Sequence, residues 1–200
     1  MLRKTHLALV AAFGVGVVSV GVAAVAEARS DRDGRQAHAV IKNVDGRIIG
    51  RFQVEHRRYG KSGVTVTVRG LTPGYHGFHI HTTGVCDPRS VDPATGSPYF
   101  SAGGHFNLGA GGHADHSGDL PNLLVGADGT GSASTVTDRF RVEQLFDKDG
   151  SAVVVHALAD NHANIPDRYT GAGGGTGPDE ATLKTGDSGG RVACGVITNR

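Results

Sequence analysis

The sequence contains no tryptophan and no run of basic residues. Apart from a possible helical turn at 142–146, no segment has a sustained 3.6-residue hydrophobic period, which excludes a helical bundle. The 32 glycines instead indicate a fold rich in turns. Without a basic cluster, neither nucleic acid nor an anionic membrane surface is expected as the main partner.

One long apolar run is present, at the N-terminus, where Arg3 and Lys4 precede an uncharged and mostly apolar stretch ending at Ala26. A basic start, an apolar stretch and small residues after it predict a secretory signal peptide over residues 1–28. Ala-x-Ala patterns place cleavage after Ala26 or after Ala28, and we favour the second. An uncleaved membrane anchor is the alternative, because the run is about as long as a thin bilayer requires.

Removal of residues 1–28 would take away two basic residues and one acidic residue, so the 20 Lys and Arg and the 19 Asp and Glu become equal in number. The mature protein is then formally neutral. Residues 29–36 are polar and unpatterned and predict a short disordered lead-in. Residues 37–200 are long enough for one domain with a real core. We expect the protein to be secreted, periplasmic or held in the cell envelope, with no membrane contact beyond the signal peptide.

Cysteine is scarce, with only Cys86 and Cys194 present. In an exported protein, an even pair of cysteines most simply forms one disulfide. Such a bond would close a loop of roughly 100 residues and contribute about 4–5 kcal/mol in the chain-entropy model. Two free thiols that act as metal ligands are the alternative.

Strand patterns recur through the predicted domain. In "VTVTVRG", the apolar side chains of Val64, Val66 and Val68 alternate with polar ones, as is typical of a strand with one buried face. Asp-Gly pairs, which supply the positive φ that tight turns need, occur at 45–46, 128–129 and 149–150. The pattern predicts an antiparallel all-β domain.

Two long segments, 82–121 and 157–191, interrupt the regular spacing of the strands and are rich in Gly, Pro, Asp and His. Loops of this length in a small domain are usually functional or disordered. The histidines favour a function, because six of the eleven lie in or beside these segments: His79, His81, His105, His113, His116 and His156. His38, His56 and His162 have no partner at ligand spacing, and His6 leaves with the signal peptide, so we assign a metal role to none of these, nor to His76.

The stretch "GFHIHTTGVC" places His79 and His81 on either side of Ile80. Residues i and i+2 share one face of a strand, so the two imidazoles project together while Ile80 points into the core. Such a pair can bind a metal ion, although two solvated polar side chains are the alternative for any lone His-x-His. His76 has the opposite strand parity and is expected to be a hydrogen-bonded structural residue.

Further motifs accompany this pair: "SAGGHFN", "GGHADHSGDLPN", "VVVHALADN" and "GGRVACGVI". With them the sequence resembles copper/zinc superoxide dismutase over nearly the whole mature chain and in the family's order. The insertion "DPRSVDPATGSPYF" resembles the bacterial secreted branch. The resemblance implies an eight-stranded antiparallel Greek-key barrel or sandwich with two long functional loops.

The resemblance also implies a set of metal ligands. Copper would be bound by His79, His81, His105 and His156, which is reasonable because imidazole suits copper. Zinc would be bound by His105, His113, His116 and Asp119, a closed set of three nitrogens and one carboxylate. Asp160 would accept hydrogen bonds from the rings of His79 and His113 and so orient them.

The activity implied is the dismutation of superoxide to dioxygen and hydrogen peroxide by a redox-cycling copper ion. In that reaction His105 would exchange a proton, Arg191 would bind the anion, and Thr185 would narrow the channel. An exported copper-binding or copper-delivery domain without turnover is the alternative. Both a monomer and a homodimer are compatible with the sequence.

One departure from the family concerns zinc. The stretch between His113 and His116 is several residues shorter than the family's usual one. The two histidines and Asp119 are still spaced three residues apart, so all of them could reach one ion. A copper-only protein and a copper and zinc protein therefore both stay open.

Overall fold

The computed structural model describes residues 36–199. The predicted signal peptide, both cleavage sites and most of the lead-in lie outside these residues. The first strand begins at Gln36, one residue before the expected start of the domain. Within residues 36–199, no helix has the length and apolar character needed to cross a lipid bilayer.

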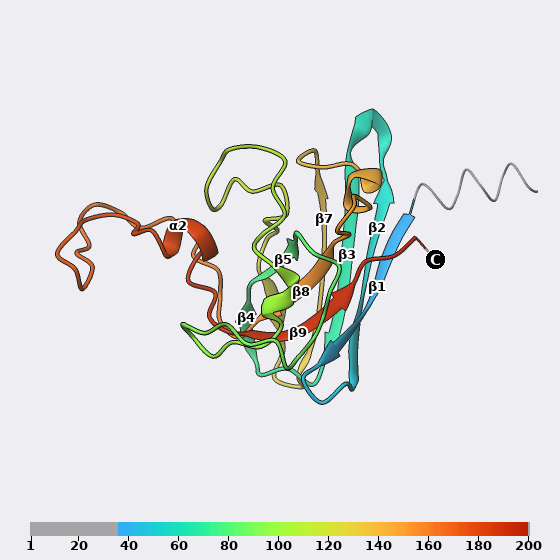
Figure 1. Ribbon diagram of the computed structural model, residues 1–200, viewed down its shortest axis with the longest axis horizontal. Coiled ribbons are helices and arrows are strands. Elements are labelled where there is room, and N and C mark those ends of the chain that lie inside the picture. Colours follow the sequence, from blue (N-terminus) through green and yellow to red (C-terminus); the bar gives the residue numbers. More distant parts are fainter. Residues whose placement is uncertain (1–35, 200) are drawn as a thin grey trace, which may run out of the picture.

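In the described part of the chain, nine strands form one antiparallel sheet (Figure 1): β1 Gln36–Asn43, β2 Ile48–His56, β3 Ser62–Arg69, β4 Gly74–His76, β5 Phe78–His81, β6 Leu123–Val125, β7 Thr130–Thr137, β8 Ala152–His156 and β9 Arg191–Val196. Short helices lie between them: η1 Arg58–Gly60, η2 Phe100–Ala102, η3 Val142–Leu145 and α2 Thr182–Thr185. The turn predicted at 142–146 is therefore a 3₁₀ helix.

The strand order is β4-β6-β7-β3-β2-β1-β9-β8-β5, so β4 and β5 lie at the two edges of the sheet. These two strands are consecutive in the chain and are separated only by Gly77. The chain therefore passes from one edge to the other at Gly77, and the sheet curls into a nearly closed barrel. Counting β4 and β5 as one bent strand gives the predicted eight.

With β4 and β5 counted as one strand, two connections among the described strands, β3 to β4 and β7 to β8, join strands that are not neighbours in the sheet. Such connections distinguish a Greek-key barrel from an up-and-down barrel. Figure 1 shows the strands wrapped around one core.

Alternation of side chains builds that core, as the sequence predicts for β3. Val64, Val66 and Val68 are buried while the polar residues between them are exposed. They pack with Phe52 of β2 and with the other buried apolar residues of the barrel. At 25–30 cal/mol for each Å² of apolar surface, burial of this set is the main stabilising contribution to the fold.

The Asp-Gly turns behave differently from one another. Gly46 and Gly129 have positive φ and lie in the β1–β2 and β6–β7 hairpins. Gly150 also has positive φ, but it precedes β8, whose partners in the sheet are β5 and β9. The third pair therefore marks a turn that does not join a hairpin.

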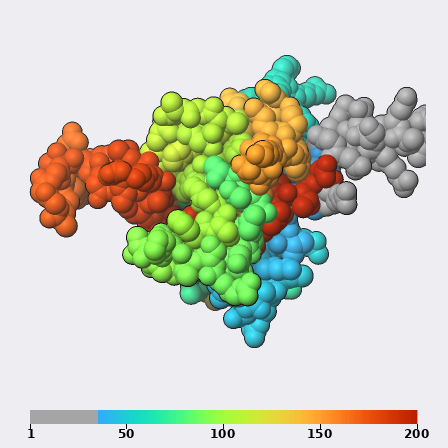
Figure 2. All heavy atoms as spheres, viewed as in Figure 1, coloured from blue at the N-terminus to red at the C-terminus, as the bar shows by residue number. Residues whose placement is uncertain are grey.

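The two long segments contain little regular structure. The first connects β5 to β6 and the second connects β8 to β9. The middle of the second segment, coloured orange to red, carries α2 and projects away from the barrel (Figures 1 and 2). The first segment begins after β5 and the second after β8, and these two strands pair with each other.

Candidate metal centre

Four histidines from separate parts of the chain converge beside β5. His79 and His81 lie on β5, His105 lies in the first long segment, and His156 ends β8. One ring nitrogen from each lies within 4.8 Å of the others. Because Ile80 between the pair is fully buried in the core, the two β5 histidines face the loops, as the strand parity predicts.

The first long segment returns along β5 and brings its side chains into register. His105 lies opposite His81, and Asp119 lies opposite His79, in isolated antiparallel bridges. The Phe106 N–H donates to the Ile80 carbonyl at 2.8 Å, and the Ile80 N–H donates to the Gly118 carbonyl at 3.0 Å. These bonds align the loop residues with β5, as a neighbouring strand would.

Each ring of the first cluster uses one nitrogen for the protein. Nδ1 of His81 bonds the Gly103 carbonyl at 2.9 Å, and Nδ1 of His156 bonds the Gly189 carbonyl at 3.1 Å. The remaining nitrogens, Nε2 in both residues and Nδ1 in His79, are buried without a hydrogen-bond partner. A buried polar atom without a partner is costly, so these atoms fit a metal ion that they would bind.

A second cluster shares His105 with the first. Nδ1 of His105 lies 2.7 Å from Asp119 Oδ1. Nδ1 of His113 and Nδ1 of His116 lie 3.1 and 3.2 Å from Asp119 Oδ2, and both nitrogens are otherwise unpartnered. The donor atoms of these four residues also lie within 4.8 Å of one another. Despite the short stretch between His113 and His116, the structure brings both into the cluster.

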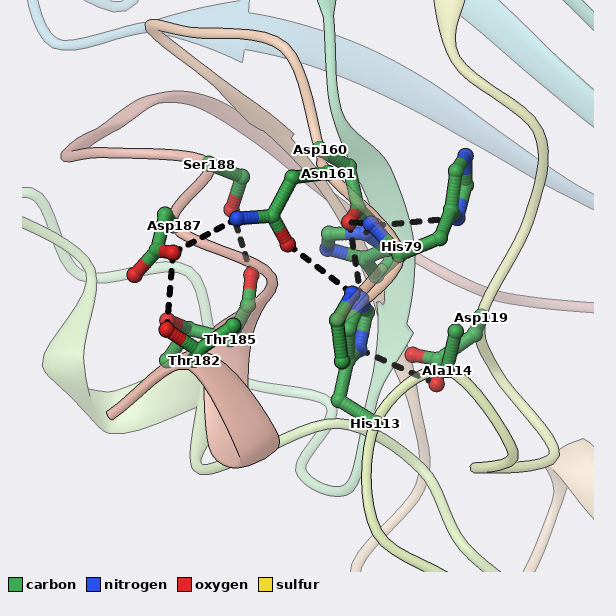
Figure 3. A network of polar contacts seen from close by, with 12 residues as sticks. His79, His113, Ala114, Asp119, Asp160, Asn161, Thr182, Thr185, Asp187 and Ser188 are labelled. Atoms are coloured by element: carbon green, nitrogen blue, oxygen red, sulfur yellow. Dashed lines mark hydrogen bonds and ion pairs between the residues drawn. The ribbon is translucent and has the colours of Figure 1, made fainter. Parts of the chain in front are cut away.

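Asp160 hydrogen-bonds one histidine of each cluster (Figure 3). Its Oδ2 lies 2.7 Å from Nε2 of His79, and its Oδ1 lies 2.8 Å from Nε2 of His113. Asn122 holds Asp160 in turn, because its side-chain oxygen accepts the Asp160 N–H and its side-chain N–H donates to the Asp160 carbonyl, both at 2.8 Å. Both rings therefore have their unpartnered Nδ1 directed away from Asp160.

Burial keeps the first cluster neutral. It lowers the pKa of His81 and of His156 well below the ordinary value. It also lowers the pKa of His79, against the opposing effect of Asp160, and lowers that of His105 to about 4. A neutral imidazole keeps the lone pair with which it binds a metal ion.

His113 has the opposite character. Burial disfavours its charged form, but the hydrogen bonds and charges of Asp119 and Asp160 outweigh burial and raise its pKa to about 9. Asp119 is likewise buried, yet His105 and His113 hold its pKa well below the usual range. The second cluster therefore stabilises positive charge, as a cation site must.

Arg191 and Thr185 line an open cavity of about 1150 Å³ together with His81, His105 and His156. A small anion in this cavity would meet both the guanidinium and the histidine rings. Thr185 ends α2, so the second long segment forms one side of the cavity.

The Arg191 side chain is held by main-chain carbonyls. Its guanidinium donates to the Tyr99 carbonyl at 2.5 Å and to the Gly103 carbonyl at 2.6 Å. Gly103 also accepts the bond from His81, so the arginine and one cluster histidine share an acceptor. The Arg191 N–H donates to Ser97 Oγ at 2.8 Å.

The predicted disulfide is confirmed, since Cys86 and Cys194 are bonded with Cα atoms 5.7 Å apart. Cys194 lies in β9, three residues after Arg191. Tyr99 packs in the same small buried cluster as Cys194, and its hydroxyl donates to the Lys42 carbonyl at 3.2 Å. The disulfide therefore ties the first long segment to the strand that carries the arginine.

Other histidines have structural surroundings. His76 is buried, with Nδ1 2.7 Å from the His156 carbonyl and Nε2 2.8 Å from the Thr72 carbonyl. It lies on β4, so the break at Gly77 separates it from the β5 pair. His162 is stacked against His113 with ring centroids 6.4 Å apart, a proximity that its sequence spacing does not indicate.

Sequence reasoning missed the residues that act through carbonyl groups or loop contacts. Ser97, Tyr99, Gly103 and Asn122 position Arg191 or Asp160. Main-chain acceptors have no residue type of their own, so no sequence pattern identifies Tyr99 and Gly103. The only available signal was that Tyr99 is the last residue but one of the insertion and that Gly103 closely precedes His105.

Residues 48–197 match the family model described as copper/zinc superoxide dismutase. The chain is 47% identical over 164 residues to the superoxide dismutase [Cu-Zn] of Mycolicibacterium paratuberculosis, covering 78% of this chain and 71% of the relative. It is 48% identical over 144 residues to that of Mycobacterium tuberculosis, covering 69% of this chain and 60% of the relative's length.

Among solved structures, the Cu/Zn superoxide dismutase from Brucella abortus matches with a TM-score of 0.60 and 27% identity, covering 80% of this chain and 98% of that one. A Greek-key barrel whose loops join two histidine clusters through one shared imidazole defines a two-site metalloprotein. The family match is specific as well as extensive, because it spans both clusters and the arginine. This chain belongs to the copper/zinc superoxide dismutase family.

Proposed function

We propose that this protein dismutates superoxide, converting two superoxide anions and two protons into one dioxygen and one hydrogen peroxide. One observation carries the proposal. Four buried histidines place one ring nitrogen each within 4.8 Å of the others, and three of them line a cavity that Arg191 also lines. A redox metal and a small anion can meet there.

The ligand atoms support an assignment of metals. His79, His81, His105 and His156 would hold copper, because an all-imidazole set suits a copper ion. His105, His113, His116 and Asp119 would hold zinc in a closed set of the kind found in structural sites. Copper supplies the one-electron redox couple that dismutation requires.

The protein's own residues handle the anion and the protons. The Arg191 guanidinium attracts superoxide to the cavity, and Thr185 limits the size of what enters. Nδ1 of His105 lies 2.7 Å from Asp119 and would face zinc together with that carboxylate, so Nε2 is the nitrogen that would hold a proton for the peroxide product. Asp160 keeps His79 and His113 oriented.

A disulfide supports an exported protein, because disulfides persist in oxidising compartments. Residues 1–28 are accordingly proposed as a signal peptide, with cleavage after Ala28 in preference to Ala26. N-terminal sequencing of the exported protein tests this assignment. A start at Arg29 agrees with it, and an intact N-terminus in the membrane fraction contradicts it.

The function is tested by titrating copper into metal-free protein and measuring superoxide loss at each step. We expect activity to rise with copper and to stop rising at one copper ion per chain. Protein that binds one copper ion tightly but does not turn over superoxide would instead match the copper-delivery alternative.

A further inference from the structure

Arg139 lies just after β7 and reaches the segment that carries the candidate zinc ligands. Its Nη1 donates to the carbonyls of Ala114 and His116, the second at 3.3 Å. Its Nη2 donates to Asp115 Oδ1 at 3.3 Å. One guanidinium therefore contacts three consecutive residues between the ligands His113 and Asp119.

This contact is anchored on the barrel. The Arg139 N–H donates to Thr137 Oγ1 at 3.1 Å, and the next residue, Phe140, is buried in the core. The Phe140 carbonyl accepts a hydrogen bond from Ser62 of β3 at 2.9 Å. The arginine thus extends from a fixed point, and the loop it holds is positioned relative to the sheet.

The segment is short, and its bridge to β5 is at its end, where Asp119 lies opposite His79 and the Gly118 N–H donates to the Phe106 carbonyl at 2.7 Å. The His113 N–H donates to the Leu183 carbonyl at 2.8 Å, which fixes its start. The Asp119 N–H donates to the His116 carbonyl at 3.2 Å, which fixes its end. Between these two bonds, Arg139 holds the Ala114 carbonyl and shares the His116 carbonyl.

We propose that Arg139 is a positioning residue of the zinc site, which holds residues 114–116 so that the rings of His113 and His116 face Asp119. The inference rests on the zinc assignment made above. It explains how a segment shortened relative to the family can still present both rings. An arginine suits this task because its planar group has five donors in a fixed arrangement, which a lysine lacks.

The ion pair with Asp115 is a lesser part of the contact. Its side chain is 83% exposed, and exposed ion pairs contribute little. The two carbonyl contacts should therefore carry the effect, which separates positioning from simple charge pairing. Asp115→Asn removes the ion pair alone. Arg139→Lys keeps the positive charge but lacks the planar guanidinium that reaches several acceptors at once.

The test uses the full exported protein, stripped of metal and titrated with zinc against a chromophoric chelator. We expect Arg139→Gln to weaken zinc binding at least tenfold, as loss of an outer hydrogen-bond partner does in other metal sites. Arg139→Lys should recover part of this loss. Arg141→Gln is the matched control, because Arg141 is a nearby exposed arginine paired with Glu143. It and Asp115→Asn should stay within twofold of the unaltered protein.

Cobalt(II) in place of zinc reports the geometry directly. The visible absorption typical of a four-coordinate cobalt site should weaken or shift in Arg139→Gln, while one copper ion still binds at the four-histidine cluster. Retained copper binding shows that the variant is folded. Zinc affinity within twofold in Arg139→Gln, or an equal loss in Asp115→Asn, overturns the positioning role. If the unaltered protein binds no zinc, the zinc assignment itself fails, and copper-dependent dismutation is unaffected by that result.

Discussion

A single imidazole can serve both protein and metal because its two nitrogens are independent. In His81 and His156, Nδ1 bonds a main-chain carbonyl and Nε2 is available to a metal ion. In His79 and His113, Nε2 bonds the Asp160 carboxylate and Nδ1 is the available nitrogen. The second partner thus decides which nitrogen is available to a metal ion. Residues that never touch a metal therefore determine the geometry of the site.

Arg191→Glu should reduce the second-order rate constant for superoxide at least tenfold, because it replaces attraction for the anion with repulsion. Copper content should not change, since the guanidinium donates its hydrogen bonds to the carbonyls of Tyr99 and Gly103. Pulse radiolysis with metal analysis measures both. The rate constant of Arg191→Lys, which keeps the charge, should lie between those of Arg191→Glu and the unaltered protein. A rate within twofold of the unaltered protein excludes Arg191 from anion binding.

Gly186→Ala should damage the second cluster. Gly186 has a φ of +60°, and an added Cβ would overlap Asp160 Oδ1 and Nε2 of His113. The hydrogen bond between them should break, with zinc affinity at least tenfold weaker. Gly173→Ala is the control, because a Cβ there meets nothing within 4 Å. Equal zinc affinity in both variants would show that the close contact of Gly186 with Asp160 and His113 does not orient His113.

At the scale of elements, regular strands were predictable and their junctions were not. The alternation in β3 identified its buried face because each side chain signals its own environment. The change of edge at Gly77 has no such signal, since the crowding that leaves no room for a Cβ there comes from Ser188 and Asp160, which are distant in the sequence. The candidate ligand residues could likewise be proposed from their motifs, whereas Arg139 contacts main-chain carbonyls, which no motif identifies.

The insertion before η2 offers a prediction about substrate attraction. Asp92 lines the same cavity as Arg191, and its carboxylate is fixed by the Ala94 N–H at 2.9 Å and by Thr95 Oγ1 at 3.0 Å. Asp92→Asn can keep the first bond while removing a charge that repels superoxide. The rate constant should rise about twofold at low ionic strength, with a smaller gain at high salt.

Asp128→Asn provides the matched control for this variant. Asp128 is also exposed, also accepts a backbone N–H two residues later, and lies in the β6–β7 turn, so the change in net charge is the same. Its rate constant should stay close to that of the unaltered protein. Equal rates in the two variants would mean that net charge, and not the position of Asp92, governs the encounter.

At the scale of the whole molecule, the barrel supports the two long loops, and these loops complete the candidate site. The Cys86–Cys194 bond joins residues 108 apart in sequence and connects the first loop to β9. Replacing both cysteines with serine should lower the free energy of unfolding of the metal-free protein by about 4–5 kcal/mol in the chain-entropy model. Guanidinium denaturation measures this loss. A loss below about 1 kcal/mol would show that the bond contributes little to stability.

The central claim is that four imidazoles bind one copper ion while one of them also faces a zinc ion. Crystals of metal-loaded protein, measured on both sides of the copper and zinc absorption edges, locate each ion directly. We predict one copper peak bonded to Nδ1 of His79 and to Nε2 of His81, His105 and His156, and a zinc peak among His105, His113, His116 and Asp119. A copper peak elsewhere, or one that His105 or His156 does not reach, would contradict the account.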